Sequence, residues 1–229
     1  RNQYYKTTQL DPSKFAVWSQ MLLIDSELED IEAIKSHGAE AITYFPAQPS
    51  LYWFKGVAHN QLREFEQAAE SLKNALLLII GNPALKVQVL ASLGDAQHEL
   101  GAYQASDSAY SEALKIEPDN AYVLNNYSYF LSLRGEHLEL AEIMAKQAVD
   151  QQPNNASYLD TYGWVLFKMG RLDDAAAQLQ KSLENGGMKS AEVLDHYGDV
   201  LSAMGKTAEA KEYWKMAIEA GGDKDQLMK

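Results

Sequence analysis

The stretch LGDAQHELGAYQASDSAYSEALKIEPDN, residues 93–120, contains two helical patterns that a turn glycine separates. Apolar and small residues recur in each half at the spacing of one helical face. Gly101 stands between the halves, and Pro118 closes the second half because proline cannot continue a helix. The stretch therefore predicts a hairpin of two antiparallel helices.

Prolines extend this pattern along the chain at an almost constant interval. Five of the six prolines are spaced 34, 37, 35 and 35 residues apart, at Pro12, Pro46, Pro83, Pro118 and Pro153. A fixed period near 34 residues is typical of stacked helical hairpins. The pairs Gly186-Gly187 and Gly221-Gly222 then replace proline as helix terminators. The whole sequence thus indicates an all-α solenoid.

A small residue occupies the eighth position of every unit when the units begin at residues 49, 87, 121, 156 and 191. These residues are Gly56, Gly94, Ser128, Gly163 and Gly198. Only a small side chain fits where two helices cross closely. The fourth and seventh positions are apolar or aromatic in these units, except that Lys55 takes the seventh position of the first one.

Together with the turn glycines Gly101, Gly135, Gly170 and Gly205 and the alanine-rich second helices, these positions make the chain resemble the tetratricopeptide repeat family. The resemblance covers nearly the whole chain and is best in units 87–120 and 156–190. It implies a right-handed α-solenoid of helix-turn-helix repeats. We expect one solenoid over 1–229, made of the end of a truncated repeat at 1–14, a degenerate repeat at 15–48, repeats at 49–86, 87–120, 121–155, 156–190 and 191–222, and a tail at 223–229.

The N-terminal unit departs from the repeat pattern. Leu22 stands where a glycine is expected, and Gly38 stands where a bulky residue is expected. Residues 1–14 fit the end of a second helix whose first helix is missing, which suggests the C-terminal piece of a longer protein. An uncovered apolar side at Phe15, Trp18 and Leu22 would then allow oligomers through this end.

Composition narrows the classes of partner. The chain has 20 basic and 32 acidic residues, a net charge of −12, and no cysteine. This charge repels nucleic acid and attracts a basic partner, or it simply keeps an elongated protein in solution. Without cysteine there is no disulfide, thiolate metal site or cysteine nucleophile. The longest purely apolar run, residues 75–80, is far shorter than the about 20 residues of a membrane span.

The resemblance implies a peptide-binding groove on the concave surface, lined by outward-facing positions of the first helices. The candidate residues are Asp95, Tyr122, Asn125, Asn126, Tyr129, Asp160, Trp164, Asp195 and Asp199. Asparagine amides pair with an extended peptide backbone, and Tyr129 and Trp164 offer apolar contact with polar tips. In the alternative interpretation, these two aromatic residues pack against the next helix.

Two other kinds of site are weighed against the groove. Some family members clamp a C-terminal carboxylate with lysine, asparagine and arginine, whereas the matching positions here are Asp95, Asn126, Asp160 and Asp195. A carboxylate would be repelled there. In LDHYGD, residues 194–199, a metal site is disfavoured because adjacent helical residues point about 100° apart and no second histidine completes the set. We expect neither a metal nor a cofactor.

The sequence contains no phosphate-binding glycine loop and no nucleophile elbow, so we expect no enzyme. The favoured function is a protein-interaction scaffold that binds an extended peptide or partner loop. The alternative is a regulatory or targeting arm of a larger enzyme or sensor with catalysis upstream of residue 1. Residues 121–136 and 154–171 also resemble C-terminal arrays of Bacteroidetes-type multi-repeat proteins, many of which carry export or lipoprotein signals. That resemblance favours the bacterial cell envelope, in the periplasm or at the outer membrane, over the cytoplasm.

Overall fold

The computed structural model describes residues 1–223 and is helical throughout that part of the chain. It divides into two compact units, residues 1–118 and 119–229, each of which is described by itself. The prediction of an all-α fold of stacked helical hairpins is confirmed in both units. The expected tail, 223–229, lies outside the described residues except for Asp223.

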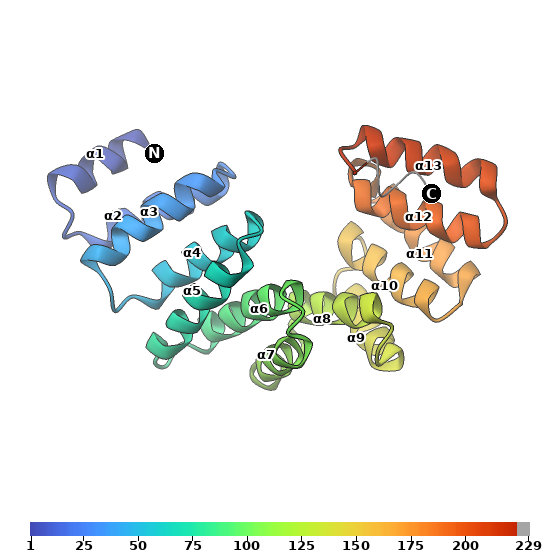
Figure 1. Ribbon diagram of the computed structural model, residues 1–229, viewed down its shortest axis with the longest axis horizontal. Coiled ribbons are helices and arrows are strands. Elements are labelled where there is room, and N and C mark those ends of the chain that lie inside the picture. Colours follow the sequence, from blue (N-terminus) through green and yellow to red (C-terminus); the bar gives the residue numbers. More distant parts are fainter. Residues whose placement is uncertain (224–229) are drawn as a thin grey trace. The chain divides into compact units, whose positions relative to one another are not determined.

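Helical hairpins build the first unit, in which α2 pairs with α3, α4 with α5 and α6 with α7. The second helix of each hairpin also packs on the first helix of the next, because α3 contacts α4 and α5 contacts α6. Figure 1 labels the helices. Their bounds are α1 Asn2–Leu10, α2 Phe15–Glu27, α3 Ile31–Tyr44, α4 Pro49–Gln61, α5 Phe65–Leu78, α6 Pro83–Glu99 and α7 Tyr103–Ile116.

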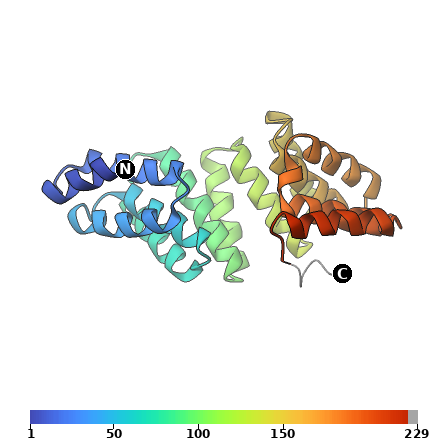
Figure 2. The same cartoon turned by 90° about the horizontal axis from the view of Figure 1, so that it is seen from above.

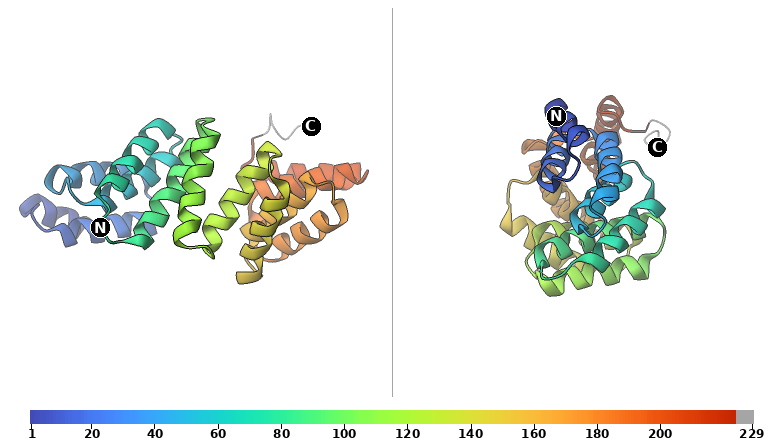
Figure 3. Two further views of the ribbon diagram at one scale, coloured as in Figure 1. Left: turned by 90° about the horizontal axis from the view of Figure 1, so that it is seen from below. Right: turned by 90° about the vertical axis from the view of Figure 1, so that its left-hand side faces the viewer.

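Three hairpins build the second unit, and their first helices α8, α10 and α12 also contact one another in sequence. Figures 2 and 3 show the helices of each unit from other directions. A short 3₁₀ helix, η1 Gly187–Lys189, precedes the last hairpin. The α-helices are α8 Ala121–Arg134, α9 Leu138–Gln151, α10 Ala156–Lys168, α11 Leu172–Glu184, α12 Ala191–Ala203 and α13 Thr207–Glu219.

Polar side chains cap the starts of four first helices, α6, α8, α10 and α12. Asn120 accepts a hydrogen bond from the backbone N–H of Val123 at 3.1 Å, and Ser190 accepts one from Val193 at 3.4 Å. Asn82 and Asn155 cap α6 and α10 in the same way. Such caps satisfy backbone donors that have no partner inside the helix, and each contributes about 1 kcal/mol. They set the register in which α8, α10 and α12 present their side chains.

Small residues at the eighth position let the two helices of a hairpin approach closely, as predicted. A Cβ atom added to Gly56 would lie 2.6 Å from Leu72, and one added to Gly94 would lie 2.7 Å from Tyr110. The corresponding distance at Gly198 is 2.5 Å, to the indole of Trp214. Real Cβ atoms do not approach so closely, so a large residue of the second helix fills the space that each glycine leaves.

The turn inside each hairpin uses a left-handed residue at the fifteenth position. The predicted glycines Gly101, Gly135, Gly170 and Gly205 have φ values of 72°, 68°, 77° and 79°. In the first two hairpins the same role falls to Glu29, with φ 53°, and Arg63, with φ 60°. The turn geometry is therefore kept in hairpins whose sequence does not signal it.

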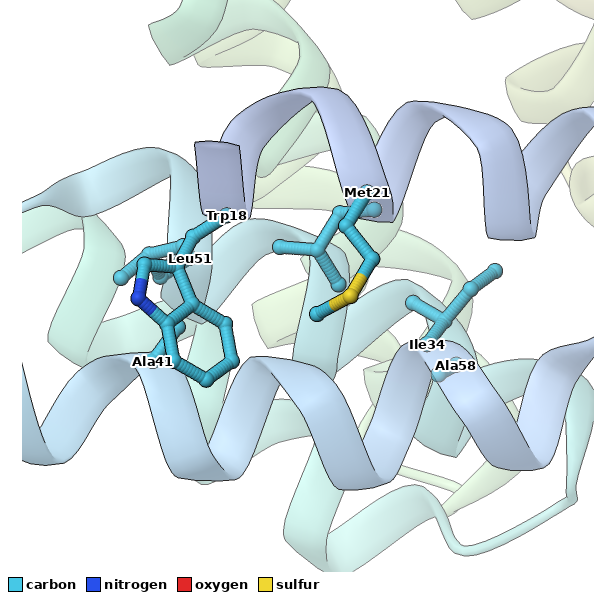
Figure 4. Close-up of a cluster of buried hydrophobic side chains, with 7 residues drawn as sticks. Trp18, Met21, Ile34, Ala41, Leu51 and Ala58 are labelled. Atoms are coloured by element: carbon cyan, nitrogen blue, oxygen red, sulfur yellow. The ribbon is translucent and has the colours of Figure 1, made fainter. Parts of the chain in front are cut away.

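A continuous apolar cluster fills the degenerate repeat at residues 15–48. Trp18 and Met21 point from α2 toward α3, as Figure 4 shows, and they pack with Ile34 of α3 and Leu51 of α4. Leu22, which replaces the expected glycine, and Trp18 are both fully buried in the same cluster, so the expectation that they form an uncovered apolar side is wrong. The degenerate repeat at 15–48 thus has a buried apolar core, although the residue at its helix crossing differs from that of the other repeats.

One helix boundary differs from expectation. The proline pattern predicts that Pro83 ends a second helix, but α5 ends at Leu78 and Pro83 is the first residue of α6. Proline suits this position because the first helical residue needs no N–H donor for the helix. The residues inserted here therefore lengthen the first helix of the next hairpin. None of the helices in the described part is long and apolar enough to span a membrane.

Candidate functional site

Three successive first helices of the second unit bring aromatic rings together. Tyr129 comes from α8, Trp164 from α10 and His196 from α12. The Trp164 and His196 rings stack with centroids 4.0 Å apart and an angle of 16° between their planes. Tyr129 lies beside them, with its ring centroid 6.2 Å from that of His196. These rings form the centre of the candidate site.

A buried ion pair holds the imidazole of His196 in place. Its Nδ1 lies 3.0 Å and 3.1 Å from the two carboxylate oxygens of Asp160, and both side chains are buried. Burial by itself lowers the pKa of His196, but the charge and hydrogen bond of Asp160, aided by Glu192 and Asp195, outweigh it and raise the pKa above its ordinary value. The histidine is therefore held as a cation over a wider pH range.

Polar and charged groups surround the ring cluster. The hydroxyl of Tyr129 donates a hydrogen bond to Oε1 of Glu192, which links α8 to α12. The ammonium of Lys168 lies 5.0 Å from the centroid of the Trp164 ring, within the range of a cation–π interaction. The rim of the site therefore contains an aromatic ring, the carboxylate of Glu192 and the ammonium of Lys168.

The nine residues of the expected groove fall into different environments. Asp95 belongs to the first unit and the other eight belong to the second. Tyr122 is 49% exposed, and the side chains of intermediate exposure are those of Asp95, Asn126, Tyr129, Asp195 and Asp199. The structure brings Tyr129, Trp164 and Asp160 together around His196.

Three of the nine side chains do not face solvent, which corrects the expectation of a fully outward-facing row. Asn125, Asp160 and Trp164 are buried because α8, α10 and α12 pack directly against one another at these positions. For Trp164 the alternative interpretation, packing on the next helix, is the one observed. Asn125 Oδ1 and Trp164 Nε1 are buried without a hydrogen-bond partner within the described residues.

Two other candidates brace the hairpins to which they belong. Asp95 accepts a hydrogen bond from the hydroxyl of Tyr110, and Asp199 accepts one from Nε1 of Trp214 at 3.0 Å. Each carboxylate follows a glycine at the helix crossing and reaches the aromatic residue that fills the space beside that glycine. Their first task is therefore structural, at equivalent positions of two repeats.

The pairing of Asp160 with His196 is a feature that sequence reasoning missed. The sequence places His196 beside Asp195 and Asp199, whereas the structure pairs it with a carboxylate 36 residues earlier. The available signal is an acidic fifth position followed by a histidine at the sixth position of the next repeat. Among the described residues, no group of three or more histidine and carboxylate side chains is placed to hold a metal ion.

Residues 87–120 match the family model described as tetratricopeptide repeat. Among solved structures, a tetratricopeptide repeat protein from Parabacteroides merdae ATCC 43184 aligns with a TM-score of 0.76 and 16% identity, over 99% of this chain and 87% of its own. PilF from Pseudomonas aeruginosa gives 0.64 and 24% over 78% and 79% of the two chains. MamA from Desulfovibrio magneticus RS-1 gives 0.59 and 19% over 75% and 94%. No curated protein sequence matches the chain. At these identities, the likeness to the solved structures establishes the fold.

Proposed function

We propose that this chain, a tetratricopeptide-repeat protein in its fold and in its matched repeat at residues 87–120, is a non-catalytic scaffold that binds an extended basic polypeptide. The proposed binding face is formed by α8, α10 and α12 of the second unit. Stacked helical repeats offer extended surfaces of this kind to their partners. The observation that carries the proposal is the meeting of three first helices at the Tyr129, Trp164 and His196 rings under an acidic rim.

Charge on this face supports a basic partner. Glu192, Asp195 and Asp199 follow one another along α12, and the cation on α10 is Lys168, whose ammonium lies over the Trp164 ring. Asp160 and His196 form an ion pair of their own underneath. The remaining acidic excess on the face agrees in sign with the net charge of −12 of the whole chain. It would speed the encounter with a cationic segment, and salt would weaken this effect.

Aromatic and amide groups on α8 supply contacts that do not depend on charge. Tyr122 is exposed, and Asn126 and Tyr129 follow it at spacings of four and three residues on the same side of the helix. An amide side chain can both donate to and accept from a peptide backbone, and tyrosine combines an apolar ring with a polar tip. The three residues therefore form a strip suited to an extended segment.

Buried groups beneath the face favour binding over catalysis. The imidazole of His196 is covered by Trp164 and paired with Asp160, so it is not placed to exchange protons with a molecule on the surface. A rigid pair of this kind instead fixes the distance and rotation between α10 and α12. A preorganised face loses less conformational entropy on binding.

A peptide-binding measurement tests the proposal. We expect fluorescence anisotropy to show saturable binding of lysine- and arginine-rich labelled peptides, with affinity that falls as salt rises, and no binding of acidic peptides of equal length. The double variant Glu192→Gln, Asp195→Asn should weaken binding several-fold. The double variant Glu212→Gln, Glu219→Gln, which removes two exposed charges from α13, serves as the matched control and should leave affinity unchanged. Equal loss in both variants, or preference for acidic peptides, would contradict the proposal.

A further inference from the structure

A second polar site lies in the first unit, and we propose that it binds a carboxylate group. A pocket of about 340 Å³ opens between α3 and α5 with α4 beneath it. Lys35 lines it from α3, Lys55 and His59 line it from α4, and Gln67, Ser71 and Asn74 line it from α5. Its volume is in the range of small-molecule sites, which begins at about 300 Å³.

Lys55 is the residue that sets this repeat apart. It occupies the seventh position, where the other units have Leu93, Tyr127, Tyr162 and Tyr197. Among the described residues, no carboxylate lies within ion-pair distance of the Lys55 ammonium. Lys55 therefore places a positive charge where the other repeats have an apolar or aromatic side chain. A partly buried cation that lacks a counterion gains free energy when an anion binds beside it.

A network behind the pocket fixes two further groups. Glu64 accepts hydrogen bonds from Lys35 Nζ at 2.8 Å and 3.0 Å, and its other contact is with His59 Nδ1 at 2.5 Å. The hydrogen bond from Lys35 holds the pKa of Glu64 below its ordinary value. Glu64 therefore neutralises the charge of Lys35 and orients the ring of His59. The Lys55 ammonium is left as the cation that can pair with a ligand.

Neutral hydrogen-bond donors line the pocket beside His59. Its side chain is only 8% exposed, and its Nε2 atom is buried without a hydrogen-bond partner within the described residues. Because Nδ1 donates to Glu64 and Nε2 is covered by protein, His59 forms part of the pocket wall and is not counted as a donor to the ligand. The amides of Gln67 and Asn74 and the hydroxyl of Ser71 add donors around the same pocket. Together with the Lys55 ammonium, the Gln67, Asn74 and Ser71 side chains match the acceptor oxygens of a carboxylate.

A ligand with a single negative charge fits better than a multiply charged one. Glu70 also lines the pocket and is exposed, so it opposes a phosphate or a polyanion. Tyr52, Lys55 and His59 share one face of α4 because their spacings of three and four residues match the helical period. Trp53 and Val57, which correspond in their repeat to the groove candidates Asp160 and Trp164, lie on the opposite side of α4, so this site is distinct from the expected peptide groove.

The carboxylate has two possible sources, a free small acid or an acidic side chain of a partner, and calorimetry with the full chain separates them. The probes are glutamate, succinate, a glutamate-containing hexapeptide and inorganic phosphate. We expect saturable binding of a carboxylate probe that is tighter than binding of phosphate. Tighter binding of the hexapeptide than of the free acids identifies a partner segment, and the reverse order identifies a small molecule.

Substitution of Lys55 decides whether the pocket is the site. Lys55→Leu restores the residue type of the other repeats, so the fold should persist, which circular dichroism checks. We expect it to weaken carboxylate binding about tenfold or more, since a hydrogen bond to a charged group contributes about 1.5–3 kcal/mol. Lys73→Leu, at an exposed position of α5 outside the pocket, is the control and should bind as wild type does. Absence of saturable carboxylate binding by the wild type, or unchanged binding by a folded Lys55→Leu variant, overturns the proposal.

Discussion

The indole of Trp164 stacks on the imidazole of His196, with ring centroids 4.0 Å apart, while Asp160 contacts Nδ1 of the same imidazole. Trp164 and Asp160 of α10 thus both contact His196 of α12. This contact joins consecutive repeats through polar as well as apolar groups, and it lies directly beneath the proposed binding face. The contact makes both the stability and the pH response of the second unit testable.

Removing the carboxylate of this pair should destabilise the second unit. Asp160→Asn leaves the shape nearly unchanged but takes away the charge that His196 contacts at 3.0 Å. We expect a loss of about 1.5–3 kcal/mol of unfolding free energy, in the range for hydrogen bonds to charged groups. Urea unfolding followed by circular dichroism measures it. Asp173→Asn, at an exposed position of α11, should shift the midpoint little, and an equal shift would contradict a special role for Asp160.

The same pair should make stability depend on pH. Because the pKa of His196 is raised in the folded chain, the folded state binds more protons than the unfolded state between the two pKa values. Its stabilising contribution is complete below the ordinary histidine pKa of about 6.5 and is lost as pH rises through the folded pKa. We expect this dependence to be absent from His196→Gln. Titration of the His196 ring signals by NMR locates the folded pKa, and a value below the ordinary one would refute the assignment.

Left-handed turn residues give a stabilising prediction. Glu29 has φ 53° at the position where four later hairpins have glycine. Left-handed backbone costs a residue with a Cβ about 1–2 kcal/mol, and glycine loses part of this gain through its greater flexibility when unfolded. Glu29→Gly should therefore stabilise the first unit by about 0.5–1 kcal/mol in thermal unfolding, while Glu29→Ala should not. Equal stability of the glycine and alanine variants would point away from backbone strain.

Two buried glycines should respond in opposite directions to alanine. A Cβ at Gly198 would lie 2.5 Å from the Trp214 indole, whereas the nearest atom to a Cβ at Gly38 is 3.7 Å away. Gly198→Ala should cost about 1–3 kcal/mol through overpacking. Gly38→Ala should gain about 0.5–1 kcal/mol because alanine is the better helix former. Thermal unfolding of the two variants gives the comparison, and loss of stability in both would show that Gly38 is also sterically required.

The hairpins could be predicted from the sequence because the residues that define each hairpin contact one another within that hairpin. A small residue at Gly94 or Gly198 repeats at a fixed position, and the space it leaves is filled by a residue of the same hairpin, Tyr110 or Trp214. Pro83 was assigned to the wrong helix because proline both ends one helix and begins the next.

The candidate site was harder to predict because it depends on contacts between repeats. Helical periodicity places Asp160 and Trp164 on a side of α10, but it does not tell how closely α12 approaches that side. Their burial follows from the direct packing of α10 on α12. The pocket at Lys55 has the same origin, since its walls belong to α3 and α5, whereas Lys55 itself was visible as a departure from the pattern.

Lys168 provides a test of the proposed partner's charge. Its ammonium lies 5.0 Å from the centroid of the Trp164 ring, so it occupies a position that a lysine or arginine of a basic peptide would favour. Lys168→Gln removes this competing cation and one positive charge from the face. We expect the affinity for basic peptides to rise severalfold at low salt, with a smaller gain at high salt because of screening. Lys181→Gln, which removes an exposed charge from α11, is the matched control and should give a smaller rise. If Lys168→Gln instead weakens the binding of basic peptides, Lys168 contributes a contact to the bound peptide and does not compete with it, which would contradict this prediction.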